Sequence, residues 1–195
     1  MRLSGNGLMA TTLAFFLVAA AGTAGADYAY VGGFGYPGTS TGQFSEIRGV
    51  AVESGGKIVT SESGTSRIQV CTELGVCSTF GSLGVLTGEF DKPREIDVNL
   101  SNNEIVIADR GNDRIQFCTT GGSCDSVGGS GTGLGQFESP RGIAVLSSTQ
   151  VAVADTENNR IQICNRQGAC SAFGSLGGSP GQFDGPAGVA VNGQG

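Results

Sequence analysis

One segment recurs along this chain of 195 residues at a nearly constant interval. Gly-Gln-Phe or Gly-Glu-Phe ends at Phe44, Phe90, Phe137 and Phe183, which are 46 or 47 residues apart, and Arg-Ile-Gln recurs at three positions with the same interval. A period of 20–50 residues is typical of proteins in which each unit buries one face against the next. We therefore expect three full units, followed by a fourth that begins at Gly181.

Each unit has the pattern of four short strands. The first strand is predicted at 49–52 and at 95–98, 142–145 and 188–191, and the second at 57–61, 105–108 and 151–154. The third alternates, with Ile68 and Val70 on one face and Gln69 on the other. The fourth runs from the second cysteine of each unit. The 35 glycines lack a three-residue period, which excludes collagen and fits tight turns. The pattern predicts an all-β fold, a β-propeller with four-stranded blades.

The third unit carries a recognisable motif. Phe137-x-x-Pro140-Arg-Gly-Ile-Ala-Val145, followed by Val153-Ala-Asp-Thr-x-Asn-Asn-Arg-Ile-Gln162, resembles the NHL repeat. The second unit departs from the motif at Glu95, where Gly is usual, and the first at Ile47, where Pro is usual. The resemblance implies a six-bladed propeller of a kind used mainly for binding, and it indicates the fold more strongly than the function.

The repeats divide the chain into successive segments. We expect a signal peptide at 1–26, an N-terminal strand that completes another blade at 27–41, blades at 42–87, 88–134 and 135–180, and the start of a fourth blade at 181–195. Within the second segment, Tyr30–Gly35 aligns with the fourth strand of a blade. Closed propellers have about four to eight blades. We therefore expect a fragment of a six-bladed propeller, and the alternative is a half-propeller that closes as a homodimer.

The N-terminus has the layout of a secretory signal. Arg2 precedes the apolar stretch Leu8–Ala21, and Ala24-Gly-Ala26 supplies small residues for cleavage before Asp27. An uncleaved anchor is the alternative, although the stretch is shorter than the ~20 residues that span a bilayer. We expect a secreted or extracytoplasmic protein, in the periplasm or at the cell surface, without membrane contact beyond this segment.

Six cysteines occur as three pairs, one in each unit. Each pair brackets a five-residue turn between the third and fourth strands, so an exported chain is expected to form Cys71–Cys77, Cys118–Cys124 and Cys164–Cys170 disulfides. Metal binding is the alternative, but the spacing is wider than in zinc knuckles and the pairs belong to separate blades. We expect no metal and no cofactor.

Composition excludes several classes of function. The chain has no histidine, which removes Ser-His-Asp and Cys-His catalysis and His-ligated zinc from these residues. A zinc-dependent lyase activity, known among NHL-like propellers, is therefore not carried over. The formal net charge of −6 also argues against a nucleic-acid partner.

Two sets of residues are candidates for binding at one end of the blades, which we call the top face: the loops before the first strand and between the second and third strands. The candidates are Arg48, Arg94 and Arg141 before the first strand, and Glu62, Asp109 and Asp155 at the end of the second. One interpretation is a ring that selects a polar or anionic ligand. The other is that each carboxylate holds its own turn and pairs with Arg67, Arg114 or Arg160.

The sequence therefore predicts a secreted binding or scaffold module, not an enzyme, that engages an extracellular protein, peptide or glycan through the top face. The alternative is part of a lyase-like or hydrolase-like propeller whose catalytic residues lie in further blades.

Overall fold

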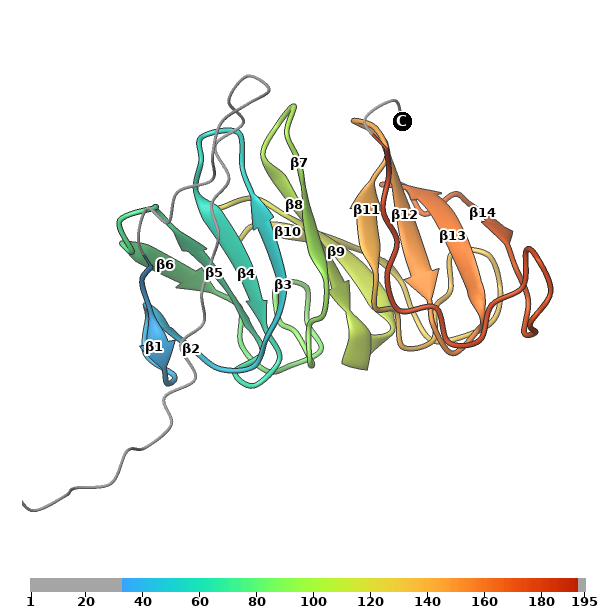
Figure 1. The fold of residues 1–195 in the computed structure, drawn as a ribbon, viewed down its shortest axis with the longest axis horizontal. Coiled ribbons are helices and arrows are strands. Elements are labelled where there is room, and N and C mark those ends of the chain that lie inside the picture. The colour runs from blue at the N-terminus through green and yellow to red at the C-terminus, as the bar shows by residue number, and fades with distance from the viewer. Residues whose placement is uncertain (1–32, 193–195) are drawn as a thin grey trace, which may run out of the picture.

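The computed structural model describes residues 33–192, and the expected signal peptide lies outside the described residues. Three four-stranded antiparallel sheets follow one another in chain order (Figure 1). The first contains β3 (Ile47–Val52), β4 (Ile58–Glu62), β5 (Arg67–Cys71) and β6 (Cys77–Phe80). The second contains β7 (Ile96–Asn99), β8 (Glu104–Asp109), β9 (Arg114–Cys118) and β10 (Cys124–Gly128). The third contains β11 (Ile143–Val145), β12 (Gln150–Asp155), β13 (Arg160–Asn165) and β14 (Cys170–Phe173).

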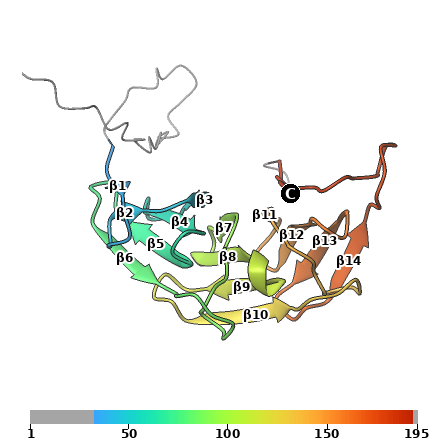
Figure 2. The same cartoon turned by 90° about the horizontal axis from the view of Figure 1, so that it is seen from below.

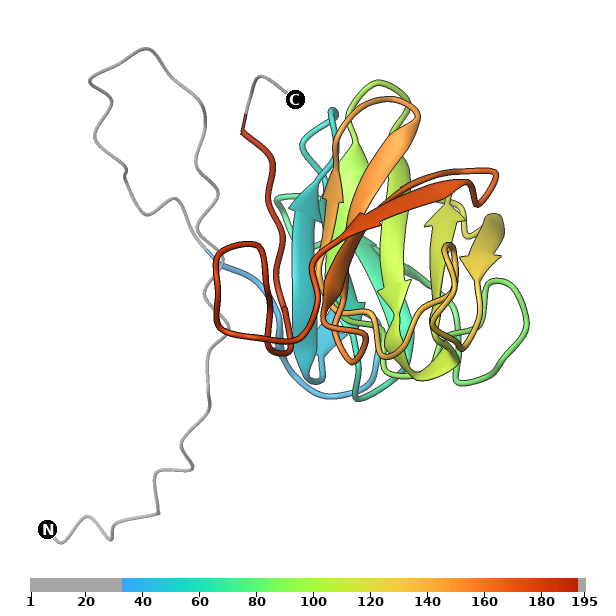
Figure 3. The same ribbon diagram turned by 90° about the vertical axis from the view of Figure 1, so that its right-hand side faces the viewer.

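The three sheets form an arc. The first strands β3, β7 and β11 lie on its concave side, and the last strands β6, β10 and β14 lie on its convex side (Figure 2). β7 contacts both β3 and β11, so the sheets lie face to face, as the end-on view in Figure 3 also shows. This is the arrangement of blades around the axis of a propeller. The predicted all-β fold with four-stranded propeller blades is confirmed.

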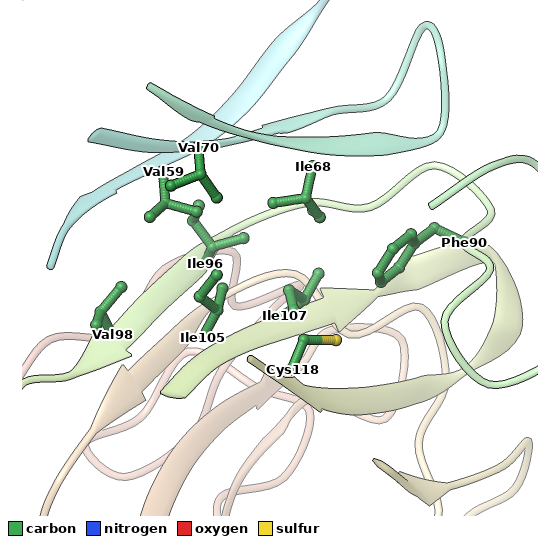
Figure 4. Close-up of a cluster of buried hydrophobic side chains, with 9 residues drawn as sticks. All are labelled: Val59, Ile68, Val70, Phe90, Ile96, Val98, Ile105, Ile107 and Cys118. Carbon is green, nitrogen blue, oxygen red and sulfur yellow. The ribbon is translucent and has the colours of Figure 1, made fainter. Parts of the chain in front are cut away.

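The hydrophobic core lies between neighbouring blades. Ile105 and Ile107 of β8 face the first blade, where they meet Val59 and Ile68 (Figure 4). The residues between them on the strand, Val106 and Ala108, face the third blade and belong to a second cluster. Because side chains alternate along a strand and both faces of this sheet are covered, β8 has apolar residues at successive positions.

Each of the four repeated phenylalanines lies at the start of one repeat unit. Phe90 and Phe137 are fully buried and belong to the two clusters between blades. Each also lies in a parallel bridge with the loop that precedes it, to Leu83 and Ser130 respectively. In the first unit the equivalent bridge is a short ladder of β1 (Tyr36–Pro37) with β2 (Gln43–Phe44).

The segment before the first blade partly follows the prediction. The rings of Phe34 and Phe44 have centroids 6.2 Å apart, which matches the 6.3 Å between Phe80 and Phe90. Phe34 therefore occupies the position of the last residue of β6. Residues 30–32 of the expected strand lie outside the described residues, and residues 33–35 form no strand.

The expected strand at 188–191 is not formed in the described chain. A strand is defined by a hydrogen-bonded partner, and no described strand pairs with this segment. It nevertheless packs against β11, because a Cβ atom built on Gly142 would lie only 2.8 Å from the Cα of Gly188. Gly49 has the same role, with its added Cβ 2.7 Å from the amide nitrogen of Ile96. Glycine thus allows close approach of the inner strands.

All three cysteine pairs form disulfides between the third and fourth strands of their blades. The Cα–Cα distances are 4.0–4.1 Å, as the cross-strand register of directly opposed residues brings them together. Cys118 and Cys164 are buried against the preceding blade. Among residues 33–192, no helix has the length and hydropathy needed to cross a membrane.

Candidate functional site

The three candidate carboxylates lie inside the blades. Glu62, Asp109 and Asp155 end β4, β8 and β12, and each is fully buried with 0% exposure. Each pairs with the arginine that begins the next strand, at distances of 3.3, 2.7 and 2.7 Å. A fully buried carboxylate needs such partners because an unpaired charge away from water is costly.

Asp109 shows how completely such a carboxylate is satisfied. Its two oxygens accept hydrogen bonds from the amide of Asp91 (2.8 Å), Asn112 Nδ2 (2.9 Å), Arg114 Nε (2.7 Å) and Gln116 Nε2 (3.0 Å). Asp155 has the same set, from Glu138, Asn158, Arg160 and Gln162. We call each such carboxylate with its arginine and glutamine a clamp. The clamps are Glu62–Arg67–Gln69, Asp109–Arg114–Gln116 and Asp155–Arg160–Gln162.

Each clamp holds the loop that joins its blade to the preceding one. Arg114 donates to the carbonyls of Val85, Leu86 and Glu89 at 2.7–2.8 Å. Gln116 accepts from the amide of Gly88 (2.8 Å) and donates to the carbonyl of Glu89 (2.6 Å). The constant spacing between Gly-Gln-Phe and Arg-Ile-Gln therefore has a structural cause. Because their side chains are used in this way, we leave the three carboxylates out of the proposed binding surface.

The candidate arginines have a different environment. Arg48 lies in β3, and Arg94 and Arg141 lie just before β7 and β11. These three first strands line the concave side of the arc (Figure 2). The two outer members have exposed acidic neighbours: Arg48 lies 3.3 Å from Glu46, and Arg141 lies 3.9 Å from Glu157. Arg94, between them, has no ion pair within the described residues. The structure thus brings these three predicted residues together on one rim.

Arg110 adds a fourth positive charge that the sequence analysis missed. It follows the clamp aspartate and begins the short 3-10 helix η1 (Arg110–Asn112). Aligning the units provides the missing signal, because Ser63 and Thr156 hold the same position in the other blades. Like Arg94, Arg110 has no ion pair in the described part of the chain. We call Arg48, Arg94, Arg110 and Arg141 the inner rim.

The guanidinium group of Arg94 lies in an electrostatically unfavourable environment. The Nε atoms of Arg94, Arg110 and Arg141 are buried, and within residues 33–192 none of them has a hydrogen-bond partner. Burial, and then the positive charges of Arg48, Arg110 and Arg141, lower the pKa of Arg94, while Glu46 opposes the shift. Within the described residues, no carboxylate pairs with the guanidinium group of Arg94 to balance its charge.

A carboxyl group next to the rim is also perturbed. Burial raises the pKa of Glu95, and the charge of Asp97 adds to the shift, while a hydrogen bond from the amide of Ile143 opposes it. Asp97 accepts from the amide of Val145 at 2.7 Å. The carboxylates of Glu95 and Asp97 thus accept hydrogen bonds from backbone amides of β11. No group of three or more His, Cys, Asp or Glu side chains suited to a metal ion occurs among residues 33–192.

Comparison with known proteins identifies the repeat. The model of the NHL repeat matches residues 137–164, which run from Phe137 through the third clamp to Cys164. The chain therefore carries an NHL repeat within a β-propeller fold. No curated protein sequence matches it.

Solved structures share the fold of this NHL-repeat chain. A Bacteroides thetaiotaomicron protein of unknown function has a TM-score of 0.64 at 14% identity, covering 82% of this chain and 45% of the other. Virginiamycin B lyase from Staphylococcus aureus gives 0.59 at 16% identity, covering 79% and 48%. A chain of a nidogen/laminin complex gives 0.57 at 19%, covering 75% and 52%. The NHL-repeat chain thus spans about half the length of these structures, and the likeness shows the fold alone.

Proposed function

We propose that this NHL-repeat chain is an exported binding module that engages a protein, peptide or glycan partner through its top face. The observation that carries the proposal is the division of its arginines into two sets. Arg67, Arg114 and Arg160 pair with buried carboxylates in the clamps, whereas Arg94 and Arg110 of the inner rim have no ion pair within the described residues. Unpaired charge at low exposure has a stability cost, and such sites are candidates for function.

Export is supported by the disulfides. Three intrachain disulfides are typical of proteins that fold in an oxidising, extracytoplasmic compartment. The apolar N-terminal segment, predicted to be a signal peptide, would direct the chain there.

A lyase-like activity is the second candidate, because virginiamycin B lyase shares the fold. Identical fold classes host both enzymes and binding proteins, so this candidate depends on chemistry at a site. Turnover of supplied virginiamycin B, followed by mass spectrometry, distinguishes this activity from binding.

The binding proposal is tested on arrays of extracellular glycans and peptides probed with the oxidised protein. We expect ligands that bind the wild type and lose binding to the inner-rim variant Arg48→Ala/Arg94→Ala/Arg141→Ala. The control is Lys57→Gln, which removes a positive charge from the opposite end of the first blade and keeps a donor for Glu53. Equal binding by the wild type and the inner-rim variant would contradict the proposal.

A further inference from the structure

We propose that the inner rim is a site for one discrete oxyanion, a carboxylate, sulfate or phosphate group, held between Arg94 and Arg110. This inference rests on the proposed use of the top face and specifies the chemistry that it recognises.

The first argument is the supply of donors. Guanidinium groups present N–H donors in a planar fork that matches the oxygens of carboxylate, sulfate and phosphate. Arg94, Arg110 and Arg141 each keep a buried Nε–H without an acceptor in the described chain. The guanidinium groups of Arg94 and Arg110 donate no hydrogen bond to a described residue, so their terminal N–H groups are the donors that an oxyanion would use.

The second argument is the balance of charge along the rim. Glu46 and Glu157 accompany the outer arginines Arg48 and Arg141, but no carboxylate comes within ion-pair distance of Arg94 or Arg110 in residues 33–192. The uncompensated charge is therefore local to the second blade. Repulsion among the four arginines is consistent with this, since it contributes to the lowered pKa of Arg94.

The third argument limits the size of the ligand. The whole chain carries a formal charge of −6, and Glu46 and Glu157 flank the rim with side chains more than half exposed. An extended polyanion would meet these carboxylates and the acidic surface, whereas a single oxyanion group would meet only the central arginines. The site therefore favours a compact anion over heparin or nucleic acid.

The repeat supplies variants that the fold tolerates. Arg110→Thr introduces the residue found at the same position of the third blade, Thr156, which donates there to the carbonyl of Pro186 at 2.8 Å. Arg94→Gln keeps the length of the stem and removes the charge. Lys57→Gln is the control for loss of one positive charge elsewhere.

The experiment is isothermal titration calorimetry of the oxidised, full-length protein with sodium sulfate, at an ionic strength kept constant with sodium chloride. We expect saturable binding of one sulfate, weakened about tenfold or more by Arg94→Gln and by Arg110→Thr, and unchanged by Lys57→Gln. An acetylated dipeptide with a free C-terminal carboxylate and glucuronic acid, as competitors, distinguish a peptide from a sugar as the source of the anion.

Two results would overturn the inference. One is absence of saturable sulfate binding to the folded wild type. The other is sulfate binding that is unchanged in Arg94→Gln and Arg110→Thr, or heparin binding that is equally strong in both variants. If partners on the arrays depend on the inner rim while sulfate does not bind, this inference fails and the proposed function stands. If sulfate binds and no partner depends on the rim, the proposed function fails.

Discussion

Two sets of arginines recur in the units of the repeat, and they have opposite effects on the stability of the fold. Arg114 lies 2.7 Å from a carboxylate with 0% exposure, and four donors converge on that carboxylate. Arg94 instead sits among other positive charges, with a buried Nε that has no partner in the described chain. The first arrangement stabilises the fold, and the second is tolerated by it.

This difference predicts the effect of removing each charge. Arg114→Gln leaves Asp109 buried and unpaired, so we expect a loss of about 3–5 kcal/mol in the free energy of unfolding. Arg94→Gln removes a partly desolvated charge that neighbouring arginines repel, so we expect the free energy of unfolding to stay the same or to rise slightly. Urea unfolding followed by circular dichroism measures both, with Arg160→Gln as a second clamp variant. A loss for Arg94→Gln as large as that for Arg114→Gln would refute the division.

Glu95 predicts a dependence of stability on pH. Its pKa in the folded state is raised, so the folded protein binds more protons than the unfolded chain as the pH rises through the ordinary glutamate value of 4.5. Stability contributed by the protonated group is therefore present below that value and is lost as the pH rises through the folded pKa. Glu95→Gln keeps an acceptor for Ile143 and should be more stable than the wild type at pH 7, with the difference vanishing near pH 3.5. A difference that stays constant over this range would exclude Glu95 as its source.

At the scale of the element, each blade is stabilised at its outer edge by a disulfide and at its inner edge by close contact with the neighbouring blade. The disulfide fixes the outer pair of strands at the end remote from the clamp, since Cys118 opposes Cys124 in the register of β9 and β10. Glycine allows the inner edges of adjacent blades to touch, as at Gly49. Both features act on packing between strands and leave the inner rim untouched.

The disulfide of the second blade should be worth roughly 2 kcal/mol, because it closes a loop of only a few residues in the unfolded chain. We expect Cys118→Ala/Cys124→Ala to lower the free energy of unfolding by about this amount and to leave sulfate binding unchanged. Denaturant titration of the oxidised proteins tests the first point. An unchanged unfolding midpoint would show that the cross-link contributes nothing.

Gly49 tests the close approach of the inner strands. In Gly49→Val the new Cβ would lie 2.7 Å from the amide nitrogen of Ile96 and 2.9 Å from the carbonyl oxygen of Arg94, so the blades must separate. We expect a loss of about 1–3 kcal/mol, measured by thermal unfolding. Gly178→Val is the matched control, because no atom lies within 4 Å of a Cβ added there. Equal effects of both variants would refute the packing role.

At the scale of the whole molecule, the interval of the repeat was enough to predict the blades and their stacking. The periodicity of two in Arg-Ile-Gln and the apolar run in β8 correspond to sheets that are covered on both faces. The prediction of a strand at 188–191 was wrong for the described chain, because a strand forms only with a hydrogen-bonded partner, and local sequence does not show whether that partner is present.

The site was harder to predict than the fold. Position in the repeat brought Arg48, Arg94 and Arg141 to one rim, yet it could not show that Glu62, Asp109 and Asp155 are buried beside them. Arg110 was overlooked because it departs from the repeat, and residues that break a repeat carry information that the period hides. The pairing of each carboxylate with an arginine was one of the two interpretations of the sequence, whereas the burial of these carboxylates is a property of the packed blades and appears only in three dimensions.

The most direct test of the account is a proton–nitrogen NMR spectrum of the arginine Nε–H groups, recorded during titration with sulfate at constant ionic strength. We predict that the resonances of Arg94 and Arg110 shift with saturation, whereas those of Arg114 and Arg160, which donate to buried aspartates at 2.7 Å, stay in place. Shifts at the clamp arginines, or an unchanged spectrum for Arg94 and Arg110, would contradict the separation of structural from ligand-binding arginines on which the account depends.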